Sequence, residues 1–219
     1  MQDQPLDVLI IGAGVSGIAV ARALQQRCPR QQFAIIERRQ RLGGTWDLFR
    51  YPGARSDSDM LSYAYGSRPW SSTRVLAEAG AIRGYLRDAV REAELDRKIL
   101  YRQRVRAAHW SSTEQLWTVH TETEGDTQPA VWRSRFLVFG TGYYDHDSGY
   151  RPQWPGLDAF RGQVMHPQHW PENIDVRGQR VVVIGSGATA VSLVPALADG
   201  GVKVTMLQCS PTWMLSMPS

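Results

Sequence analysis

The chain has 219 residues, enough for one large domain or two modest ones with a sizeable core. Hydrophobic residues make up 42% and charged residues 21%, a balance that is typical of globular proteins and unlike that of disordered chains. The formal net charge is +4, but lysines and arginines are scattered among acidic residues, so we expect no nucleic-acid-binding face. The two cysteines, Cys28 and Cys209, fit no metal or redox spacing, which indicates reduced thiols, a cytoplasmic location and no metal site.

The sequence also argues against a membrane anchor. The amino terminus has no cationic region ahead of its apolar run, so it is a poor signal peptide. The apolar stretch Val8–Leu24 is shorter than a typical membrane span, and glycines, Ser16 and Arg22 interrupt it. We therefore expect no transmembrane segment.

The first part of the chain has the pattern of a strand–helix–strand unit. The apolar run Val8–Ile11 predicts a buried parallel strand, and Val15–Gln26 predicts a helix directly after it. Phe33–Ile36 predicts a second buried strand. Together these elements predict a βαβ unit, in which a helix connects two parallel strands.

The middle of the chain predicts a long loop, a helix and several strands. Arg41–Tyr65 is rich in glycine, proline and polar residues without a clear period, and its length indicates a functional loop. Leu76–Glu94 predicts an amphipathic helix. Strand-like runs follow at Val105–Trp110, Trp117–Thr121 and Phe136–Phe139, and we expect the last to be buried. The helix positions expected to face inward are Ile82, Leu86, Ala89, Val90 and Ala93.

A first glycine turn joins the predicted strand Val8–Ile11 to its helix. Gly12-Ala13-Gly14-Val15-Ser16-Gly17 fits G-x-G-x-x-G in the strand-to-helix context where this pattern binds a dinucleotide. Gly12 permits the tight turn, Gly14 lets backbone approach a pyrophosphate, and Gly17 lets the helix pack on the strand. Glu37 follows the second strand, where its carboxylate can accept hydrogen bonds from both ribose hydroxyls. Because Glu37 would repel a 2′-phosphate, this turn suits FAD or NAD and disfavours NADP.

A second glycine turn lies near the end of the sequence. Gly185-Ser186-Gly187-Ala188-Thr189-Ala190 fits G-x-G-x-x-A between the apolar run Val181–Ile184 and a predicted helix at Ala188–Leu197. The next predicted strand, Val204–Leu207, ends without an acidic residue, and such an end tolerates a 2′-phosphate. The fold class is therefore α/β: a Rossmann-like dinucleotide-binding domain followed by the start of a second one.

A long motif separates the two glycine turns. The segment Phe160–Pro171, FRGQVMHPQHWP, matches F-x-G-x-x-x-H-x-x-x-W-P in full. This pattern resembles the fingerprint of the type I Baeyer–Villiger monooxygenases, which are class B flavin-dependent monooxygenases. Gly43-Gly44-Thr45-Trp46 and the segment Arg50–Met60, RYPGARSDSDM, most resemble the ethionamide-activating subgroup of that family. The resemblance covers essentially the whole chain.

The resemblance implies two cofactors and a set of binding residues. It implies a two-dinucleotide-binding flavoprotein with FAD at the first glycine turn and NADPH at the second. Gly44, Thr45, Trp46 and Tyr63 would lie near the flavin, and Gly142 would lie where the chain crosses from the flavin to a hinge. The predicted binding residues at the second turn are Gly185, Gly187, Ala190 and Ser210.

Two residues have candidate catalytic roles by the same resemblance. Asp57 matches the acidic residue near the flavin–nicotinamide site, where it would pair with a catalytic arginine; the alternative is a structural Asx turn. For His166 we favour a conformational role in the hinge over acid–base chemistry. We expect Trp170 and Phe160 to pack in the hinge rather than contact substrate. No residue of this chain is assigned as the catalytic arginine, which would belong to the second half of a protein about twice as long.

Cys209 departs from the family pattern. Relatives commonly carry arginine at this position, where a guanidinium would pair with the 2′-phosphate of NADPH. Ser210 and Thr212 can still donate hydrogen bonds, but a neutral thiol cannot replace a bidentate guanidinium. We therefore expect weaker NADPH binding or preference, by roughly ten- to a hundredfold.

The resemblance implies the following organisation and function. An FAD-binding domain is expected over residues 1–145, a linker with the fingerprint over 146–178, and the start of an NADP-binding domain over 179–219. The implied reaction is Baeyer–Villiger oxidation, in which a C4a-peroxyflavin inserts one oxygen of O2 next to a ketone carbonyl. The alternatives are an N- or S-oxygenating flavin-containing monooxygenase acting on an amine or sulfide, and a truncated, non-catalytic FAD-binding remnant. We expect the chain alone to bind FAD weakly and turn over poorly.

Overall fold

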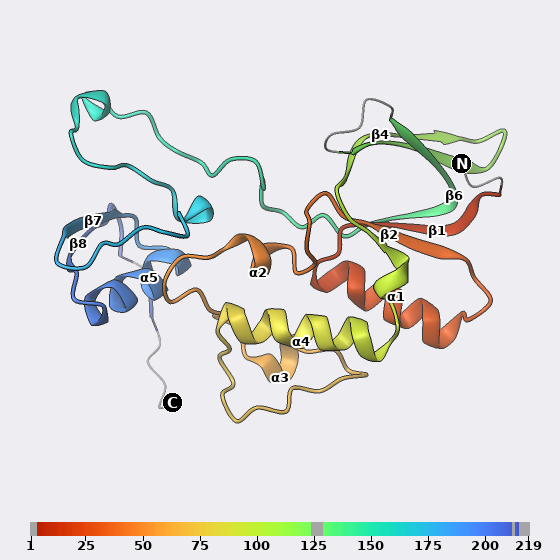
Figure 1. The fold of residues 1–219 in the computed structure, drawn as a ribbon, viewed down its shortest axis with the longest axis horizontal. Coiled ribbons are helices and arrows are strands. Elements are labelled where there is room, and N and C mark those ends of the chain that lie inside the picture. Colours follow the sequence, from red (N-terminus) through yellow and green to blue (C-terminus); the bar gives the residue numbers. More distant parts are fainter. Residues whose placement is uncertain (1–3, 124–128, 212, 215–219) are drawn as a thin grey trace. The chain divides into compact units, whose positions relative to one another are not determined.

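The structure is a computed structural model that describes residues 4–123, 129–211 and 213–214 (Figure 1). The chain divides into two compact units. Unit 1 comprises Met1–Asp47 and Arg83–Tyr144, and unit 2 comprises Leu48–Ile82 and Asp145–Ser219. The functional domains predicted from the sequence concern cofactor binding, and their boundaries stay a prediction.

Unit 1 contains the predicted strand–helix–strand unit and the strands that follow it. Its strands are β1 (Leu6–Ile11), β2 (Phe33–Ile36), β3 (Ile99–Leu100), β4 (Gln103–Ser111), β5 (Leu116–Thr123) and β6 (Ala130–Phe139). Its helices are α1 (Val15–Arg27), most of α2 (Thr45–Leu48), the larger part of α4 (Ala79–Glu92) and the short 3-10 helix η1 (Asp96–Lys98). The two buried strands and the helix predicted before residue 37 are all present in the structure.

The strands of unit 1 form one six-stranded sheet with the order β3-β2-β1-β6-β5-β4. β1 pairs in parallel with β2 on one side and with β6 on the other, so Ile10 lies between Ile35 and Val138. β5 then pairs antiparallel with β6 and with β4. The chain leaves β1 toward β2 and returns beyond β1 at β6. The carboxyl ends of β1 and β6 therefore form a topological switch point, where open α/β sheets bind ligands.

The core of unit 1 surrounds β1 and β2, as their apolar sequences predict. Leu9, Ile10 and Ile35 are fully buried, and Ile36 is nearly so. α1 and α4 lie side by side (Figure 1), and Arg22 of α1 donates a hydrogen bond of 2.6 Å to the Ala89 carbonyl of α4. This bond gives a buried guanidinium a partner, as burial of a charged group requires.

Helix α4 is shorter than the sequence pattern predicts. Ile82, Leu86, Ala89 and Val90 are buried as expected, but the helix ends at Glu92 and leaves Ala93 outside it. Glu94 adopts the left-handed conformation with φ 49°. A residue in this conformation ends a helix, and the Leu95 amide then donates back to the Val90 carbonyl.

The expectation that Phe136–Phe139 is a buried strand is wrong in one respect. The segment is part of β6, but Phe136 is 66% and Phe139 60% exposed. The pairing of β6 explains this result. β1 pairs with β6 as far as Phe139, whereas β5 pairs with it only from Ala130 to Ser134. Within the described residues, the last part of β6 therefore has a neighbouring strand on one side only.

Unit 2 contains the second strand–helix–strand unit. β7 (Arg180–Ile184) and β8 (Lys203–Leu207) pair in parallel, and α5 (Ala188–Asp199) connects them. The short helix α3 (Met60–Tyr63) and the 3-10 helices η2 (Leu157–Ala159) and η3 (Pro167–His169) complete the unit. The start of α4 also belongs to it.

The core of unit 2 joins α5 to part of the long loop. Tyr51, Leu193, Leu197 and Val202 form its buried cluster. Gly53 has φ 78°, and a Cβ atom there would overlap the Ser192 carbonyl oxygen and lie 2.7 Å from the Ala196 side chain. The Tyr51–Gly53 part of the loop therefore packs directly on α5, and only glycine fits at position 53.

Candidate functional site

The first glycine turn lies at the switch point of the unit 1 sheet. Gly12 has φ 101°, and a Cβ atom there would lie 2.5 Å from the Gly140 carbonyl oxygen. A Cβ atom on Gly17 would overlap the Gly12 carbonyl oxygen. Position 12 therefore requires glycine because of its backbone conformation and because Gly140, directly after β6, lies so close. Position 17 requires glycine because α1 approaches β1 closely there. Both roles agree with those predicted for the first and third glycines.

Gly14 is different, because neither backbone strain nor a contact with the described residues requires glycine there. Its φ of −84° and ψ of −170° are open to any residue, and an added Cβ atom would lie at an ordinary contact distance of 3.7 Å from its nearest neighbour. Gly14 is the N-cap of α1 and gives the helix no side-chain cap. Gly14 therefore places no side chain in front of the positive end of the helix dipole, and this end suits a pyrophosphate.

Glu37 follows β2 and stabilises this turn through hydrogen bonds. It is 4% exposed, and its Oε2 accepts a hydrogen bond of 2.8 Å from the Ala13 amide. Its Oε1 accepts another of 2.8 Å from the Arg39 amide. Each carboxylate oxygen can accept more than one hydrogen bond, so both retain capacity for a ribose hydroxyl. Glu37 thus lies beside the glycine turn, at the position predicted for ribose recognition.

The Gly43-Gly44 pair packs against the first glycine turn. The Gly43 amide donates to the Ala13 carbonyl at 2.9 Å. A Cβ atom on Gly44 would lie 3.1 Å from the Gly14 Cα, and the φ of Gly44 is 54°. Thr45 and Trp46 begin the short helix α2 immediately afterwards. The segment that contains Gly44, Thr45 and Trp46 therefore lies against the first glycine turn at Gly14.

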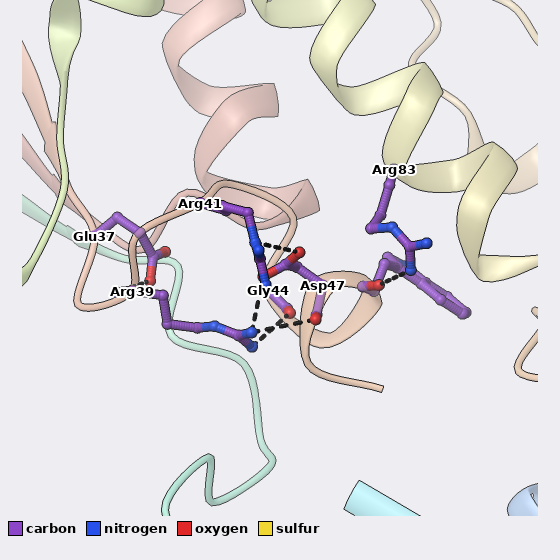
Figure 2. Close-up of polar contacts among 7 residues, drawn as sticks. Glu37, Arg39, Arg41, Gly44, Asp47 and Arg83 are labelled. Atoms are coloured by element: carbon purple, nitrogen blue, oxygen red, sulfur yellow. Dashed lines mark hydrogen bonds and ion pairs between the residues drawn. The ribbon is translucent and has the colours of Figure 1, made fainter. Parts of the chain in front are cut away.

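An ion-pair cluster that the sequence did not reveal holds the Gly-Gly turn in place (Figure 2). Asp47 is 3% exposed, and its Oδ2 lies 2.8 Å from Nη2 of Arg39. Nε of Arg41 lies 3.2 Å from the other carboxylate oxygen. Arg39 also donates to the carbonyls of Gly44 at 3.5 Å and of Asp47 at 3.2 Å.

A further arginine fixes the start of α2. Nη1 of Arg83, on α4, donates to the Trp46 carbonyl at 3.0 Å (Figure 2). The sequence signal for these contacts was weak. Asp47 lies six residues after Arg41 and eight after Arg39, beyond the Gly43-Gly44 turn, so only the folded turn brings the carboxylate to the two arginines.

Two other glycines follow β6, and one of them is a predicted site residue. The Gly140 amide donates to the Ile11 carbonyl at 2.8 Å and continues the β1–β6 pairing past both strands. Gly142 has φ 71°, lies exposed and would meet no atom with an added Cβ. Its glycine is thus explained by backbone conformation alone.

Asp57 and Tyr63 lie in unit 2, in the part of the long loop around α3. Asp57 is exposed, whereas its neighbour Ser56 is buried and exchanges hydrogen bonds with the backbone of Ser58. Tyr63 is the last residue of α3, whose N-cap Asp59 accepts a hydrogen bond of 2.9 Å from the Ser62 amide. The predicted roles of Asp57 and Tyr63 at the flavin stay predictions.

The fingerprint segment is fixed around its histidine. Nδ1 of His166 accepts a hydrogen bond of 3.2 Å from the Gln168 amide and caps η3. The buried Gln168 side chain donates to the Asp145 carbonyl at 2.5 Å. Gly149 lies directly against the imidazole, because an added Cβ would overlap ring atoms of His166. Burial, with smaller effects of His169 and Arg151, lowers the pKa of His166, so the imidazole favours the neutral form that accepts this bond.

The two aromatic residues of the fingerprint differ from each other. Trp170 packs against the unit 2 core cluster, as a packing role predicts. Phe160 is 60% exposed and lines a pocket, and its ring lies against Gly162, where an added Cβ would be 2.6 Å from ring atoms.

The second glycine turn repeats the geometry of the first. Gly185 has φ 122°, and its amide donates to the Leu207 carbonyl at 2.8 Å. Gly187 is the N-cap of α5 with φ −75° and ψ −176°, and an added Cβ would meet no atom of the described residues within 4 Å. Ala190 is buried at the start of α5. Oγ of Ser186 donates to the Ser210 carbonyl at 3.0 Å, which ties the turn to the segment after β8.

A pocket of about 550 Å³ adjoins this turn. It lies among η2, the turn after β7 and the segment after β8, and it includes Cys209 and the predicted residue Ser210. Thr212, the other predicted hydrogen-bond donor, lies outside the described residues.

Other kinds of site receive no support in the described residues. No group of three histidine, cysteine or carboxylate side chains could hold a metal ion there. No helix in that part of the chain is long and apolar enough to cross a membrane. Cys28 and Cys209 are both free thiols.

Comparisons with known proteins agree on one kind of enzyme. A family model described as pyridine nucleotide-disulphide oxidoreductase matches residues 9–218. The chain is 50% identical over 218 residues to a probable FAD-binding monooxygenase, AlmA, of Acinetobacter baylyi, covering 99% of this chain and 44% of that protein. It is 49% identical over 214 residues to the FAD-containing monooxygenase EthA of Mycobacterium tuberculosis, covering 97% and 43%.

The solved structures that match this chain include monooxygenases. The OTEMO complex with FAD and NADP matches with a TM-score of 0.80 at 32% identity, over 96% of this chain and 40% of that one. An oxidized steroid monooxygenase bound to NADP matches with a TM-score of 0.79 at 29% identity, over 93% and 38%. The chain thus spans less than half the length of the curated relatives it matches.

Proposed function

Because this chain belongs to the pyridine nucleotide-disulphide oxidoreductase family, we propose that it forms the FAD-binding part and a pyridine-nucleotide-binding part of a flavin-dependent monooxygenase. FAD would bind at the first glycine turn of unit 1, and NADPH at the second glycine turn, in unit 2. The name of the family includes disulphide chemistry, but Cys28 and Cys209 are free and exposed and supply no redox pair. The monooxygenase assignment therefore has more support than disulfide reduction.

One observation carries this proposal. Gly14 and Gly187 are the second glycines of their turns, and neither is required by backbone conformation or by packing against the described residues. A side chain at either position would instead fill the space in front of a helix N-terminus. Glycine there is explained by the close approach of a ligand, and a pyrophosphate matches the positive helix end.

The residues of unit 1 would bind and orient the flavin. Gly12, Gly14 and Gly17 would leave room for the pyrophosphate, and Glu37 would accept hydrogen bonds from ribose. Arg39 and Asp47 would keep Gly44 against Gly14, so that Thr45 and Trp46 begin α2 next to the bound cofactor. Bound FAD would supply the activation of O2, which no amino-acid side chain can provide.

For the reaction we propose Baeyer–Villiger oxidation: a ketone, O2, NADPH and a proton give an ester or lactone, NADP⁺ and water. The fingerprint ending in Trp170-Pro171 supports this reaction over N- or S-oxygenation, which would act on an amine or sulfide. Asp57 would position a catalytic arginine, and His166 would fix the hinge conformation. The proposed location is the cytoplasm, and the proposed partners are the small-molecule substrate and O2.

The binding of FAD tests the first part of this proposal. We expect the 219-residue chain to bind FAD, with changes in the visible flavin spectrum on titration. Gly14→Ala should weaken binding about tenfold or more, because the added methyl group fills the approach to the helix end. Gly84→Ala adds the same methyl group within α4, where it would meet no other described residue within 4 Å apart from the backbone of the helix itself and its chain neighbours, and it should leave FAD affinity unchanged. Equal losses of FAD affinity in the two variants would contradict the assignment of the FAD site to the first glycine turn.

Turnover tests the second part. The FAD-loaded chain is supplied with NADPH and, in separate reactions, with a cyclic ketone, a tertiary amine and a thioether, and the products are identified by mass. A lactone supports the proposed reaction, whereas an N-oxide or sulfoxide alone supports N- or S-oxygenation. FAD binding without any oxygenated product agrees with the poor turnover expected of the chain alone, so the identity of a product, and not its absence, decides between the two reactions.

A further inference from the structure

The pocket beside the second glycine turn has an unusual chemical character. Its 11 lining residues come from the segment Trp154–Phe160, the turn Ile184–Ser186 and the end of β8 with the residues after it. None of these described lining residues carries a charge. Its apolar side chains include Trp154, Leu157 and Phe160, and its polar groups are hydroxyls, the thiol of Cys209 and backbone.

The position of the pocket indicates which part of a dinucleotide it would receive. In a strand–glycine turn–helix–strand unit, the pyrophosphate lies at the turn and the ribose of the adenosine lies at the end of the second strand. Here the second strand is β8, and Leu207, Cys209 and Ser210 at its end line the pocket. Trp154 and Phe160, which are 42% and 60% exposed, offer aromatic surface for a purine ring.

Selection between the two coenzymes normally depends on charge at this place. A carboxylate after the second strand accepts hydrogen bonds from the ribose hydroxyls of NAD, and an arginine pairs with the 2′-phosphate of NADP. Neither group is among the described residues that line this pocket. Oγ of Ser186 already donates to the Ser210 carbonyl at 3.0 Å, so it is directed at the protein backbone.

We propose that this pocket receives the adenosine end of the pyridine dinucleotide without selecting for a 2′-phosphate, and that Cys209 is the position at which this selection is absent. The proposal rests on the proposed function, because it assigns the second glycine turn to a pyridine dinucleotide. It adds that the chain binds NAD and NADP forms with similar affinity, and that one positive charge at position 209 is enough to create a preference.

The test is calorimetric titration of the 219-residue chain with NADP⁺ and with NAD⁺, which needs no turnover. For the native chain we expect dissociation constants that agree within about threefold. Cys209→Arg should tighten NADP⁺ binding about tenfold or more and leave NAD⁺ unchanged, and added salt should reduce this gain. Cys28→Arg places the same charge at an exposed thiol in unit 1 and is the matched control, expected to leave both constants unchanged. Trp154→Ala should weaken both coenzymes alike, by about fivefold or more, if the purine lies on the aromatic wall.

Each outcome has a distinct meaning. Native binding of NADP⁺ more than about tenfold tighter than NAD⁺ would overturn the inference while leaving the proposed function intact. An unchanged ratio of affinities in Cys209→Arg, with circular dichroism showing a folded protein, would remove Cys209 from the coenzyme site. Binding of neither dinucleotide would overturn the inference together with the assignment of the second glycine turn, and the FAD titration would still decide the flavin site.

Discussion

Asp47 is buried beneath Arg39, with Oδ2 of the carboxylate 2.8 Å from Nη2 of the guanidinium and only 3% of the aspartate side chain exposed. Arg39 is itself only 20% exposed. The pair therefore differs from the surface ion pairs of this chain, which water and salt screen. Its contacts with the Gly44 and Asp47 carbonyls make it a structural support for the Gly43-Gly44 turn.

Asp47→Ala should lower the free energy of unfolding by about 2–4 kcal/mol, because it leaves a largely buried guanidinium without its carboxylate. Asp88→Ala is the matched control, since Asp88 pairs with Arg91 at 2.7 Å on the surface of α4, with side chains 42% and 76% exposed. The control should cost no more than about 1 kcal/mol. Chemical denaturation of both variants measures the difference, and equal losses would contradict a structural role for Asp47.

The first glycines of the two turns should differ in their tolerance of alanine. Both have positive φ. An added Cβ at Gly12 would lie 2.5 Å from the Gly140 carbonyl oxygen, whereas one at Gly185 would meet no atom within 4 Å in the part of the chain that the structure describes. Gly185→Ala should therefore cost only backbone strain, about 1–3 kcal/mol, whereas Gly12→Ala should cost distinctly more because β6 must also move. Thermal unfolding of the two variants ranks them, and a larger loss for Gly185→Ala would refute the explanation.

Gly149 should depend on His166 in a way that a double-mutant cycle can detect. An added Cβ at position 149 overlaps the imidazole, so Gly149→Ala should destabilise the protein by about 1–3 kcal/mol. In a His166→Ala background the obstacle is gone, and the same substitution should have almost no effect. The coupling energy from four denaturation curves measures this contact. Strict additivity of the two substitutions would show that the contact carries no energy.

Acid should weaken the fingerprint segment through His166. Burial lowers the pKa of this imidazole from its ordinary value of 6.5, so below pH 6.5 the unfolded chain takes up a proton more readily than the folded one. The stability from neutral His166 is therefore complete above pH 6.5 and falls as the pH drops toward the folded-state pKa. Protonation of Nδ1 would also remove the bond from the Gln168 amide.

The measurement is the free energy of unfolding at about pH 7.5 and about pH 5.5, on either side of the ordinary histidine pKa, for the native chain and for His166→Asn. The variant should lose less stability on acidification than the native chain. His109→Asn, at an exposed histidine of β4, is the control and should behave like the native chain. An acid sensitivity that is identical in all three proteins would assign the effect to other groups.

The sequence predicted the parts of the fold that depend on local patterns. Runs such as Val8–Ile11 and Phe33–Ile36 are apolar at every position because both faces of these strands are covered, and a glycine turn marks where the helix begins. The same reasoning misjudged Phe136–Phe139, because burial there depends on neighbouring strands and not on the apolar sequence. The short helices α2 and α3 were also missed, since a single helical turn has no periodicity to detect.

The candidate site was predictable where glycine positions define it. Gly12, Gly14 and Gly17 follow a spacing that has a physical reason; the structure requires glycine at positions 12 and 17, whereas the pyrophosphate role of Gly14 stays a prediction. The Arg39–Asp47 pair could not be predicted, because the two residues meet only after the Gly43-Gly44 turn reverses the chain. Gly149 lies beside His166 although the two are far apart in the sequence and share no regular spacing, so no local pattern indicates their contact.

The partly unpaired edge of β6 has a consequence for handling the protein. Among the described residues, the part of β6 after Ser134 has no strand on its β5 side, and Phe136 and Phe139 in this part are exposed. Such an edge can add a strand from a second molecule, and natural sheets usually protect it with charge, proline or a covering segment. The purified chain should therefore self-associate as its concentration rises, and Phe136→Lys should improve its solubility without disturbing the β1–β6 pairing.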